Sequence, residues 1–333
     1  MRIATIIGTR PNYIKVKPIA DFYAESEDFV LIDTNQHYSQ SMSDNLVSEL
    51  GLRIDHNLRV ENVTTLGFLS GCLSSLGDLL CSVRPDVVLV IGDTNSTLAA
   101  SLASNKLGIP LAHIEAGVRC GDRGRPEEVN RVLIDELASL HFISRETDAS
   151  NVSNPIYIGD LEYVLLNSFL SDGLVPPFCS NGSIVMTLHR SDTVTPELIR
   201  EVFRFCSSWD GDVVFPAHHR TLSIISGSKI DVPSNVSVVE PMSYLSMIRA
   251  LSCCSAVISD SGGVVKTMPF FGKRCLVPAG PIEWSQTVRS GFVRSGLDME
   301  WLCSEPPASD RSFYLCDSPL SRIDEALRAV VGE

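Results

Sequence analysis

Short hydrophobic runs alternate with longer stretches of helical periodicity along the first half of the chain. The runs are rich in β-branched residues and predict buried parallel strands, whose sequences are nearly continuously apolar. The predicted strands are Ile3–Ile7, Phe29–Asp33, Val87–Ile91, Leu111–Glu115, Leu140–Ser144 and Ile156–Ile158. The predicted helices between them are Pro11–Glu25, Ser41–Leu50, Val63–Ser82, Ser96–Lys106 and Pro126–Ala138. This alternation predicts a doubly wound parallel α/β sheet.

A second alternating unit follows a linker-like segment rich in Ser, Gly and Pro, Ser171–Gly182. Its predicted strands are Ser183–Thr187, Asp212–Pro216, Val236–Val239, Ala256–Ser259 and Arg274–Val277. Its predicted helices are Pro196–Ser208, Ser243–Ala250 and Gly263–Phe271, and an amphipathic helix, Leu320–Val331, ends the chain. We predict a Rossmann-like domain (1–170), a nucleotide-binding Rossmann-like domain (171–315) and a C-terminal helix (316–333) that returns to the first domain. Two such domains facing each other enclose a cleft, the default ligand site.

Composition narrows the functional classes. With 333 residues, 44% of them hydrophobic and 20% charged, the chain has the composition of a soluble protein that is long for one core. The net charge of −13 argues against a nucleic-acid partner, because a phosphate backbone requires a basic surface. No run approaches the roughly 18 uninterrupted apolar residues that span a bilayer. The apolar start is too short for a signal peptide, so we expect a cytoplasmic protein without a membrane partner.

The ten cysteines do not indicate a metal or disulfide framework. They are spread singly apart from Cys253-Cys254, and no Cys-x-x-Cys spacing occurs. We therefore expect reduced cysteines that mainly pack. No helical pair of histidines four residues apart accompanies the carboxylates, and we predict neither a metal nor a cofactor.

Three acidic residues, Asp93, Glu115 and Glu127, lie near the ends of predicted strands or at the start of a helix. Carboxylates at strand ends in an α/β protein converge on the ligand crevice, and proton transfer is the first function to consider. The alternative is a set of helix caps and ion pairs, with Asp93 near the helix at Ser96 and Glu127 or Glu128 at its own helix start. Glu115 fits this alternative least, because apolar neighbours flank it and burial would raise its pKa.

Two strand-to-helix turns are candidate anion sites. Gly8-Thr9-Arg10-Pro11 begins a helix that also carries Lys15, and Asp260-Ser261-Gly262-Gly263 repeats the design in the second domain. Small residues let the backbone approach an anion, and the helix contributes its positive end. A capped helix or a tight turn without a ligand is the competing explanation.

Histidines follow two strands of the second domain. His189 stands in Thr187-Leu188-His189-Arg190, and the pair His218-His219 follows Phe215-Pro216. A histidine at a strand end reaches the ligand site, and we expect one of the pair to face it and the other to face solvent. A hydrogen-bonded structural histidine is the alternative for each.

Together these motifs resemble the non-hydrolysing UDP-N-acetylglucosamine 2-epimerases, from residue 1 to about residue 292. The resemblance rests on motifs in the family's order: Gly8–Pro11 with Ile14-Lys15, Gln36-His37-Tyr38, Gly92-Asp93-Thr94, His113–Arg119, Pro126–Arg131, Thr187–Arg190 and Asp260–Gly263. The resemblance implies a GT-B fold and inversion at C2 of a UDP-sugar without an oxidising cofactor. UDP would leave by anti elimination, giving a 2-acetamidoglucal, and then add back.

The resemblance also implies residue roles. It makes Asp93, Glu115, Glu127 and His189 the acid, base and intermediate-stabilising groups. It assigns nucleotide or substrate contacts to Arg10, Lys15, His218, Ser261, Gly262, Gly263 and Glu283. Cationic and N–H donors around a diphosphate would stabilise departing UDP.

Three segments depart from the family pattern, all in the second domain. Val264–Thr267 replaces the usual Gln-Glu-Glu continuation, so Thr267 stands where a glutamate holds the ribose. Ile282–Gln286 replaces the Thr-Glu-Arg-Pro-Glu run, and Ser191–Thr193 replaces a Glu-Asn ending. All four catalytic positions are retained, which indicates retained chemistry, while the three altered segments leave the identity of the nucleotide or sugar open.

We therefore predict a 2-epimerase of UDP-GlcNAc or a modified relative, active in surface-polysaccharide synthesis and assembled as a homodimer. One alternative is a hydrolysing epimerase that releases ManNAc and UDP. Another is a GT-B glycosyltransferase, which the three carboxylates disfavour, and a last one is a nucleotide-sugar-binding protein without turnover.

Overall fold

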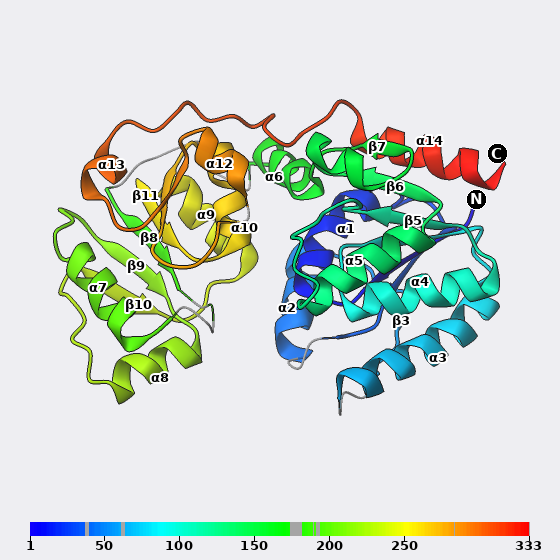
Figure 1. Ribbon diagram of the computed structural model, residues 1–333, viewed down its shortest axis with the longest axis horizontal. Helices are drawn as coiled ribbons and strands as arrows, with labels where there is room; N and C mark the ends of the chain where they lie inside the picture. The colour runs from blue at the N-terminus through cyan, green and yellow to red at the C-terminus, as the bar shows by residue number, and fades with distance from the viewer. Residues whose placement is uncertain are drawn as a thin grey trace. The chain divides into compact units, whose positions relative to one another are not determined.

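The computed structural model describes residues 1–36, 40–60, 64–173, 182–188, 190, 194–282 and 284–332. The chain forms two compact units, drawn in Figure 1: unit 1 comprises Met1–Leu166 and Tyr314–Glu333, and unit 2 comprises Asn167–Phe313. The chain passes from unit 1 to unit 2 inside α6 (Leu161–Ser171), a helix that the sequence analysis did not predict. Most of the predicted linker, 171–182, lies outside the described residues.

Unit 1 is built on a parallel sheet in the order β3-β2-β1-β4-β5-β6-β7. Its central strands are apolar and fully buried because helices cover both faces. The strands are β1 (Ile3–Ile7), β2 (Phe29–Asp33), β3 (His56–Asn57), β4 (Val87–Ile91), β5 (Leu111–Ile114), β6 (Leu140–Ile143) and β7 (Pro155–Tyr157). Each adjacent pair of these strands is parallel.

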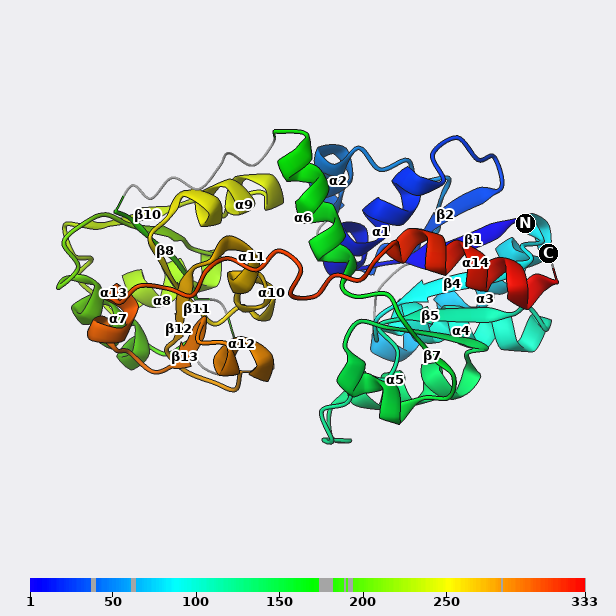
Figure 2. The same ribbon diagram turned by 90° about the horizontal axis from the view of Figure 1, so that it is seen from above.

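The helices of unit 1 bury one stripe each. In α3, Phe68, Cys72, Leu76 and Leu80 recur every fourth residue and pack into the core with α4. The helices are α1 (Arg10–Phe22), α2 (Gln40–Leu50), α3 (Thr65–Val83), α4 (Asn95–Leu107), α5 (Pro126–Leu137), the short 3₁₀ helix η1 (Glu146–Asn151) and α14 (Pro319–Val331). Figure 2 shows the C-terminal α14, in red, back beside unit 1, where it packs against α1 and β6.

Helix α3 is also the one described helix with the length and composition of a membrane span, with 19 residues and a mean hydropathy of 1.5. Its inner stripe has a structural role in this fold, whereas Leu66 and Leu73 on other positions are exposed. Part of the apolar surface of α3 is therefore exposed.

Unit 2 repeats the design with a parallel sheet in the order β10-β9-β8-β11-β12-β13. Its core gathers apolar side chains from β8, β9, β11 and α7, including Ile199, Val202 and Phe203. The strands are β8 (Ile184–Thr187), β9 (Val213–Pro216), β10 (Val236–Val239), β11 (Ala256–Ser259), β12 (Arg274–Val277) and β13 (Val293–Ser295). The helices are α7 (Pro196–Cys206), α8 (His219–Gly227), α9 (Tyr244–Cys253), α10 (Gly262–Lys266), α11 (Met268–Phe271), α12 (Ser285–Arg289) and α13 (Met299–Cys303).

The prediction of two Rossmann-like units with parallel sheets, the domain type of GT-B proteins, is confirmed. The single helix predicted at 263–271 is wrong, because the chain forms α10 and α11 with a break at Thr267. Pro269 lacks the N–H that a continuous helix requires. The described cysteines form no disulfide with one another, and Cys72 and Cys206 pack in the two cores.

Each sheet has a point where the strand order reverses. In unit 1 it lies between β1 and β4, and in unit 2 between β8 and β11. Helices leave such neighbouring strands on opposite sides, so the loops at their carboxyl ends separate and open a crevice for a ligand. A ligand site is therefore expected at these two edges of the sheets.

Candidate active site

The carboxyl edge of unit 1 brings together residues from three neighbouring strands. Arg10 follows β1, Asp93 follows β4 and Glu115 follows β5. Since β1, β4 and β5 are adjacent in the sheet, the loops that carry these residues are neighbours as well. The predicted convergence of Asp93 and Glu115 therefore has a geometric basis within unit 1.

Glu115 lies just outside β5 in a left-handed backbone conformation, with φ of 69°. Such a conformation is unusual for a residue with a side chain and marks a position that the surrounding structure enforces. The Glu115 carboxylate pairs with Lys15, with Oε1 2.6 Å from Nζ, and the two side chains are only 18% and 15% exposed. The sequence analysis expected an apolar setting for Glu115 and did not foresee this partner.

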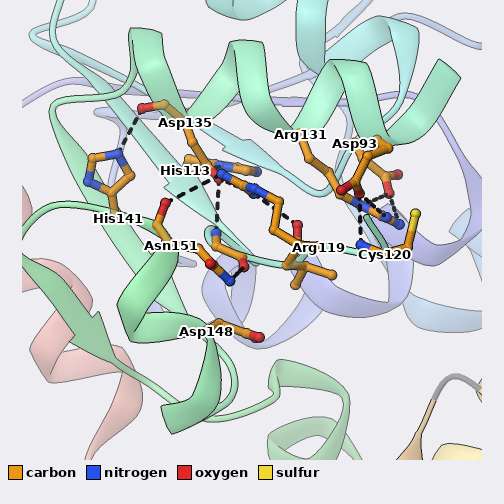
Figure 3. Close-up of polar contacts among 12 residues, drawn as sticks. Asp93, His113, Arg119, Cys120, Arg131, Asp135, His141, Asp148 and Asn151 are labelled. Carbon is orange, nitrogen blue, oxygen red and sulfur yellow. Dashed lines mark hydrogen bonds and ion pairs between the residues drawn. The ribbon is translucent and has the colours of Figure 1, made fainter. Parts of the chain in front are cut away.

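Asp93 is held by Arg131, which reaches it from α5 (Figure 3). One oxygen, Asp93 Oδ2, accepts from both Nε and Nη2 of Arg131, at 2.8 and 2.6 Å. Burial raises the pKa of Asp93 above its ordinary value; the charge of Arg131 opposes this and that of Glu115 adds to it. Asp93 does not cap α4, because Thr94 does so by accepting from the Thr97 N–H.

The neighbours Glu127 and Glu128 have different roles in the structure. Glu127 is exposed in the first turn of α5, and no hydrogen bond or ion pair joins its side chain to another described residue. Glu128 is 3% exposed, and its two oxygens accept from the backbone N–H groups of Cys120 and Gly121, both at 2.9 Å. Burial alone would raise the pKa of Glu128, but these N–H groups and Arg131 outweigh it and lower the pKa to about 2.

The turn after β1 is tightly packed. A Cβ on Gly8 would lie 2.3 Å from both Ser96 Oγ and Thr34 Oγ1, so only glycine fits there. Thr9 caps α1 through a reciprocal arrangement with Asn12, whose Oδ1 accepts from the Thr9 N–H at 3.2 Å. The capped-helix alternative is therefore correct for Thr9, while Arg10 stands half-buried at the first helical position.

Unit 2 places its predicted residues after β9 and β11, the two strands on either side of β8. Ser261, Gly262 and Gly263 follow β11 and begin α10, and His218 follows β9 as the residue before α8. His218 is half-buried and His219 exposed, as expected for a pair with one residue facing solvent. His189, Glu283 and the segment Ser191–Thr193 lie outside the described residues, as do His37 and Tyr38.

Asp260 connects the two loops at this edge of unit 2. Its Oδ2 accepts from the backbone N–H of Arg190 at 2.9 Å, which fixes the loop after β8 to the loop after β11. Ser259 accepts from the Ser261 N–H at 3.0 Å. These bonds shape a turn that presents Ser261 and the two glycines.

Several polar residues of unit 1 were quoted as motif members without a role. Asn130 donates to the backbone oxygen of Asp93 at 2.9 Å. Gln36 Oε1 accepts from the N–H of Ser96 at 3.0 Å. Their place in the motifs was the only sequence signal, because a spacing along the chain does not reveal a partner in space.

The family model described as UDP-N-acetylglucosamine 2-epimerase matches residues 22–157 and 164–299. The chain belongs to this family of isomerases. A UDP-2,3-diacetamido-2,3-dideoxy-D-glucuronate 2-epimerase of Pseudomonas aeruginosa is 33% identical over 323 residues, which cover 90% of each protein.

Solved structures of the epimerase family have the same fold. The Methanocaldococcus jannaschii UDP-GlcNAc 2-epimerase in complex with UDP-GlcNAc and UDP matches with a TM-score of 0.77 and 26% identity, covering 99% of this chain and 100% of that one. The Neisseria meningitidis UDP-GlcNAc 2-epimerase bound to UDP-GlcNAc matches with a TM-score of 0.79 and 25% identity over the full length of both.

Two departures of this epimerase-family chain from the usual motifs lie next to each other in unit 2. The buried Lys266 of α10 has its Nζ 5.5 Å from the centre of the Trp284 ring. The Thr267 hydroxyl donates to the Val264 backbone oxygen at 2.9 Å and so bonds within its own turn. The two altered segments are thus joined by a cation–π contact.

Proposed function

We propose that the chain inverts C2 of UDP-GlcNAc, or of a modified UDP-N-acetyl sugar, by elimination and re-addition of UDP. A base removes the C2 proton, the C1–O bond to UDP breaks, and a C1–C2 double bond forms. A phosphate oxygen of UDP then attacks C1 while C2 receives a proton on the opposite face. The observation that carries the proposal is the pair of cation-held carboxylates, Asp93 and Glu115, on adjacent strands.

Two carboxyl groups in different electrostatic settings suit a reaction that takes and gives a proton. Burial raises the pKa of Asp93, so this carboxyl group holds a proton more readily than an exposed aspartate does. Glu115 pairs with the cation of Lys15 at 2.6 Å, and we assign it the role of the base. Glu127, exposed in this structure, and His189 remain proposed members of the catalytic set.

The nucleotide would be held by groups that donate to phosphate. Arg10 at the start of α1 supplies a guanidinium, Ser261 supplies its hydroxyl, and Gly262 and Gly263 supply N–H groups at the start of α10. We assign diphosphate contacts to these residues and to His218, with Glu283 as a further substrate contact. Lys15, assigned to the nucleotide by resemblance, pairs with Glu115 in the structure, so its cation serves the carboxylate here.

The sugar is proposed to be a modified UDP-N-acetyl sugar as well as, or instead of, UDP-GlcNAc. The Pseudomonas relative is named for a diacetamido uronate, a sugar with an added acetamido group and a carboxylate. The Lys266–Trp284 contact and the inward-bonded Thr267 support a changed binding surface in unit 2. Surface-polysaccharide synthesis is the proposed use of the product.

Three alternatives remain distinguishable by their products. A hydrolysing enzyme would let water add at C1 and release ManNAc and UDP. A glycosyltransferase would transfer the sugar to an acceptor, and the two paired carboxylates have no evident part in that reaction. A binding protein would hold the nucleotide sugar and leave C2–H intact.

The test is proton NMR of the purified protein in D2O with each of two substrates, UDP-GlcNAc and the UDP-diacetamido uronate. The C2 epimer of either UDP-sugar, carrying deuterium at C2, is the expected product. Free ManNAc with UDP would establish the hydrolysing alternative. Binding of both sugars without exchange at C2 would establish the binding protein and overturn the proposal.

The homodimer and the cytoplasmic location stay predictions. Helix α3 offers a surface for self-association, because Leu66 is 78% exposed and Leu73 is exposed on the same helix. Exposed apolar side chains on one element favour association with another protein surface. Sedimentation of wild type and of Leu66→Glu would compare the masses, and two monomeric samples would reject the homodimer.

A further inference from the structure

A buried histidine connects the two carboxylate-bearing turns of unit 1 without taking part in the proposed proton transfer. His113 of β5 has no solvent exposure, and its Nδ1 lies 2.6 Å from Asp135 Oδ1 on α5. Its Nε2 lies 2.9 Å from the backbone oxygen of Gly92, the residue before Asp93. Figure 3 shows His113 near Asp135, which belongs to α5.

Both partners of His113 are hydrogen-bond acceptors. A carboxylate oxygen and a backbone carbonyl oxygen have lone pairs and no proton to give. A neutral imidazole would leave one bare ring nitrogen facing an oxygen lone pair, an uncompensated repulsion in a buried site. A proton on each ring nitrogen, the imidazolium form, would satisfy both acceptors.

A second buried histidine on the neighbouring strand provides the contrast. His141 Nε2 lies 2.9 Å from the backbone oxygen of Asp135, whereas its Nδ1 has no partner among the described residues. His141 therefore faces one acceptor, whereas His113 faces two. The two histidines have similar burial and differ in the groups that surround them.

Asp135 is the hub of this network. Besides His113, its carboxylate accepts from the backbone N–H of Gly117 at 3.0 Å and from Arg119 Nη1 at 2.6 Å. Burial alone would raise the pKa of Asp135, but the bonds to His113, Arg119 and Gly117 outweigh it and lower the pKa. An ionised carboxylate in contact with His113 favours a positive charge on that ring.

The His113–Asp135 network contacts the backbone next to both carboxylates of the site, Asp93 and Glu115. His113 holds the peptide directly before Asp93, and Asp135 holds the peptide two residues after Glu115. The backbone of Glu115 is left-handed, a conformation that a residue with a side chain disfavours. Contacts with neighbouring residues must therefore hold this turn in place. The other charged or titratable groups on α5 and on the strands beside β5 are Glu127, Glu128, Arg131, Glu136 and His141, and Asp93 and Glu115 follow β4 and β5.

We propose that His113 is a buried imidazolium and that the His113–Asp135 pair positions Asp93 and Glu115 by fixing the turns that carry them. The expected effect of the His113–Asp135 pair on turnover rests on the proposed function. Neither residue touches the sugar in this account; both are positioning residues. A misplacement of a reacting group by about 1 Å costs roughly 10²-fold in rate, so loss of the pair should lower kcat on that scale.

The first test reads the protonation state directly, with no variant and no substrate. Nitrogen NMR of histidine-labelled wild type at about pH 7.5, one unit above the ordinary histidine value, distinguishes protonated from bare ring nitrogens. We expect two protonated nitrogens for His113 and one for His141, which serves as the internal reference. A bare nitrogen in His113 would overturn the imidazolium.

The second test compares Asp135→Asn with Asp148→Asn. Asp148 is a matched control, because it is similarly buried and pairs with Arg145 but bonds to neither His113 nor the Gly117 N–H. Asp135→Asn should deprotonate one nitrogen of His113, speed hydrogen exchange of the Gly117 amide, and lower kcat about 10²-fold with little change in KM. Asp148→Asn should leave the protonation of His113 and kcat near those of wild type.

The outcomes separate this inference from the proposed function. Identical Gly117 exchange and kcat in the two variants would overturn the positioning role. If wild type turns over neither sugar, the proposed function fails, while the nitrogen spectrum and the amide exchange still decide the state of His113 and its anchoring of the turn.

Discussion

The two units share one strand order but differ in the chemistry at the edge where that order reverses. In unit 1 the residues after β4 and β5 are carboxylates paired with cations, Asp93 with Arg131 and Glu115 with Lys15. In unit 2 the carboxylate at the corresponding edge, Asp260, accepts from the backbone N–H of Arg190, and the hydroxyls of Thr187 and Ser259 bond to each other at 2.6 Å. The fold fixes where a site lies, and the residues at that place decide what it does.

The contrast assigns different tasks to the two edges. Partly buried ion pairs are costly to desolvate and are weak evidence for stability, so their placement at the unit 1 edge indicates function. Small residues and N–H groups at the unit 2 edge suit the recognition of a phosphate. Proton transfer is therefore expected to depend on unit 1, and nucleotide affinity in part on unit 2.

The largest expected effect is that of Glu115→Gln. Removing a positioned acid or base lowers turnover by roughly 10²–10⁴-fold, while the amide still fits the space of the carboxylate. Steady-state kcat and KM of the variant measure it, with circular dichroism to verify the fold. Unchanged turnover would remove Glu115 from the mechanism and with it the assignment of proton transfer to this edge.

Glu127 and Glu128, neighbours on α5, should contribute differently to the free energy of unfolding. Glu128→Gln loses charge-assisted bonds to the Cys120 and Gly121 N–H groups and should lower the free energy of unfolding by about 2 kcal/mol. Glu127→Gln, at an exposed position, should change it by less than about 0.5 kcal/mol. Urea denaturation at neutral pH compares them, and equal stabilities would contradict the structural role of Glu128.

The effect of Glu128 should also depend on pH. Its pKa in the folded chain, about 2, lies below the ordinary 4.5, so its stabilisation is fully present above the ordinary value. The stability difference between wild type and Glu128→Gln should therefore shrink as pH falls from 4.5 towards about 2. A difference that grows on acidification would reverse the assigned sign.

A smaller effect is expected for Arg10→Ala. Loss of one charge-assisted contact to phosphate weakens binding by about 1.5–3 kcal/mol, or roughly 10- to 100-fold in Kd for UDP. Titration calorimetry with UDP measures it, and Arg2→Ala, an exposed arginine of the same unit, is the matched control. Equal affinities for the two variants would reject the role of Arg10.

The smallest effect is expected for Ser261→Ala in unit 2. The Ser261 side chain makes no capping bond to α10, so stability should stay within about 0.5 kcal/mol of wild type. A lost neutral hydrogen bond to phosphate should raise the Kd for UDP about fivefold. A stability loss above 1 kcal/mol with unchanged affinity would mean that Ser261 shapes the turn instead.

Much of the fold and part of the site follow from local sequence patterns. The apolar runs located β1, β4, β5, β8 and β11, and hence the edges where Asp93, Glu115 and Ser261 stand. The prediction works because a parallel strand is buried on both faces and its end faces the ligand crevice. Short elements with weak patterns, such as α6 and α8, were missed.

The sequence did not predict which side chains contact one another in the folded protein. Lys15 and Glu115 are far apart along the chain, and neither position reveals the other. The left-handed backbone of Glu115 is set by its surroundings, since local preference disfavours it. The buried His113–Asp135 contact likewise leaves no periodic trace, because each is a single polar residue in an apolar element.

The division of tasks between the two edges can be tested most directly by deuterium incorporation at C2 in D2O, with saturating UDP-sugar, for Glu115→Gln and Ser261→Ala side by side. Saturation removes differences in affinity, so the exchange rate reports proton transfer alone. The account predicts that Glu115→Gln loses roughly 10²-fold or more of the exchange rate, while Ser261→Ala keeps most of it. Equal losses in both variants, or a retained rate in Glu115→Gln, would contradict it.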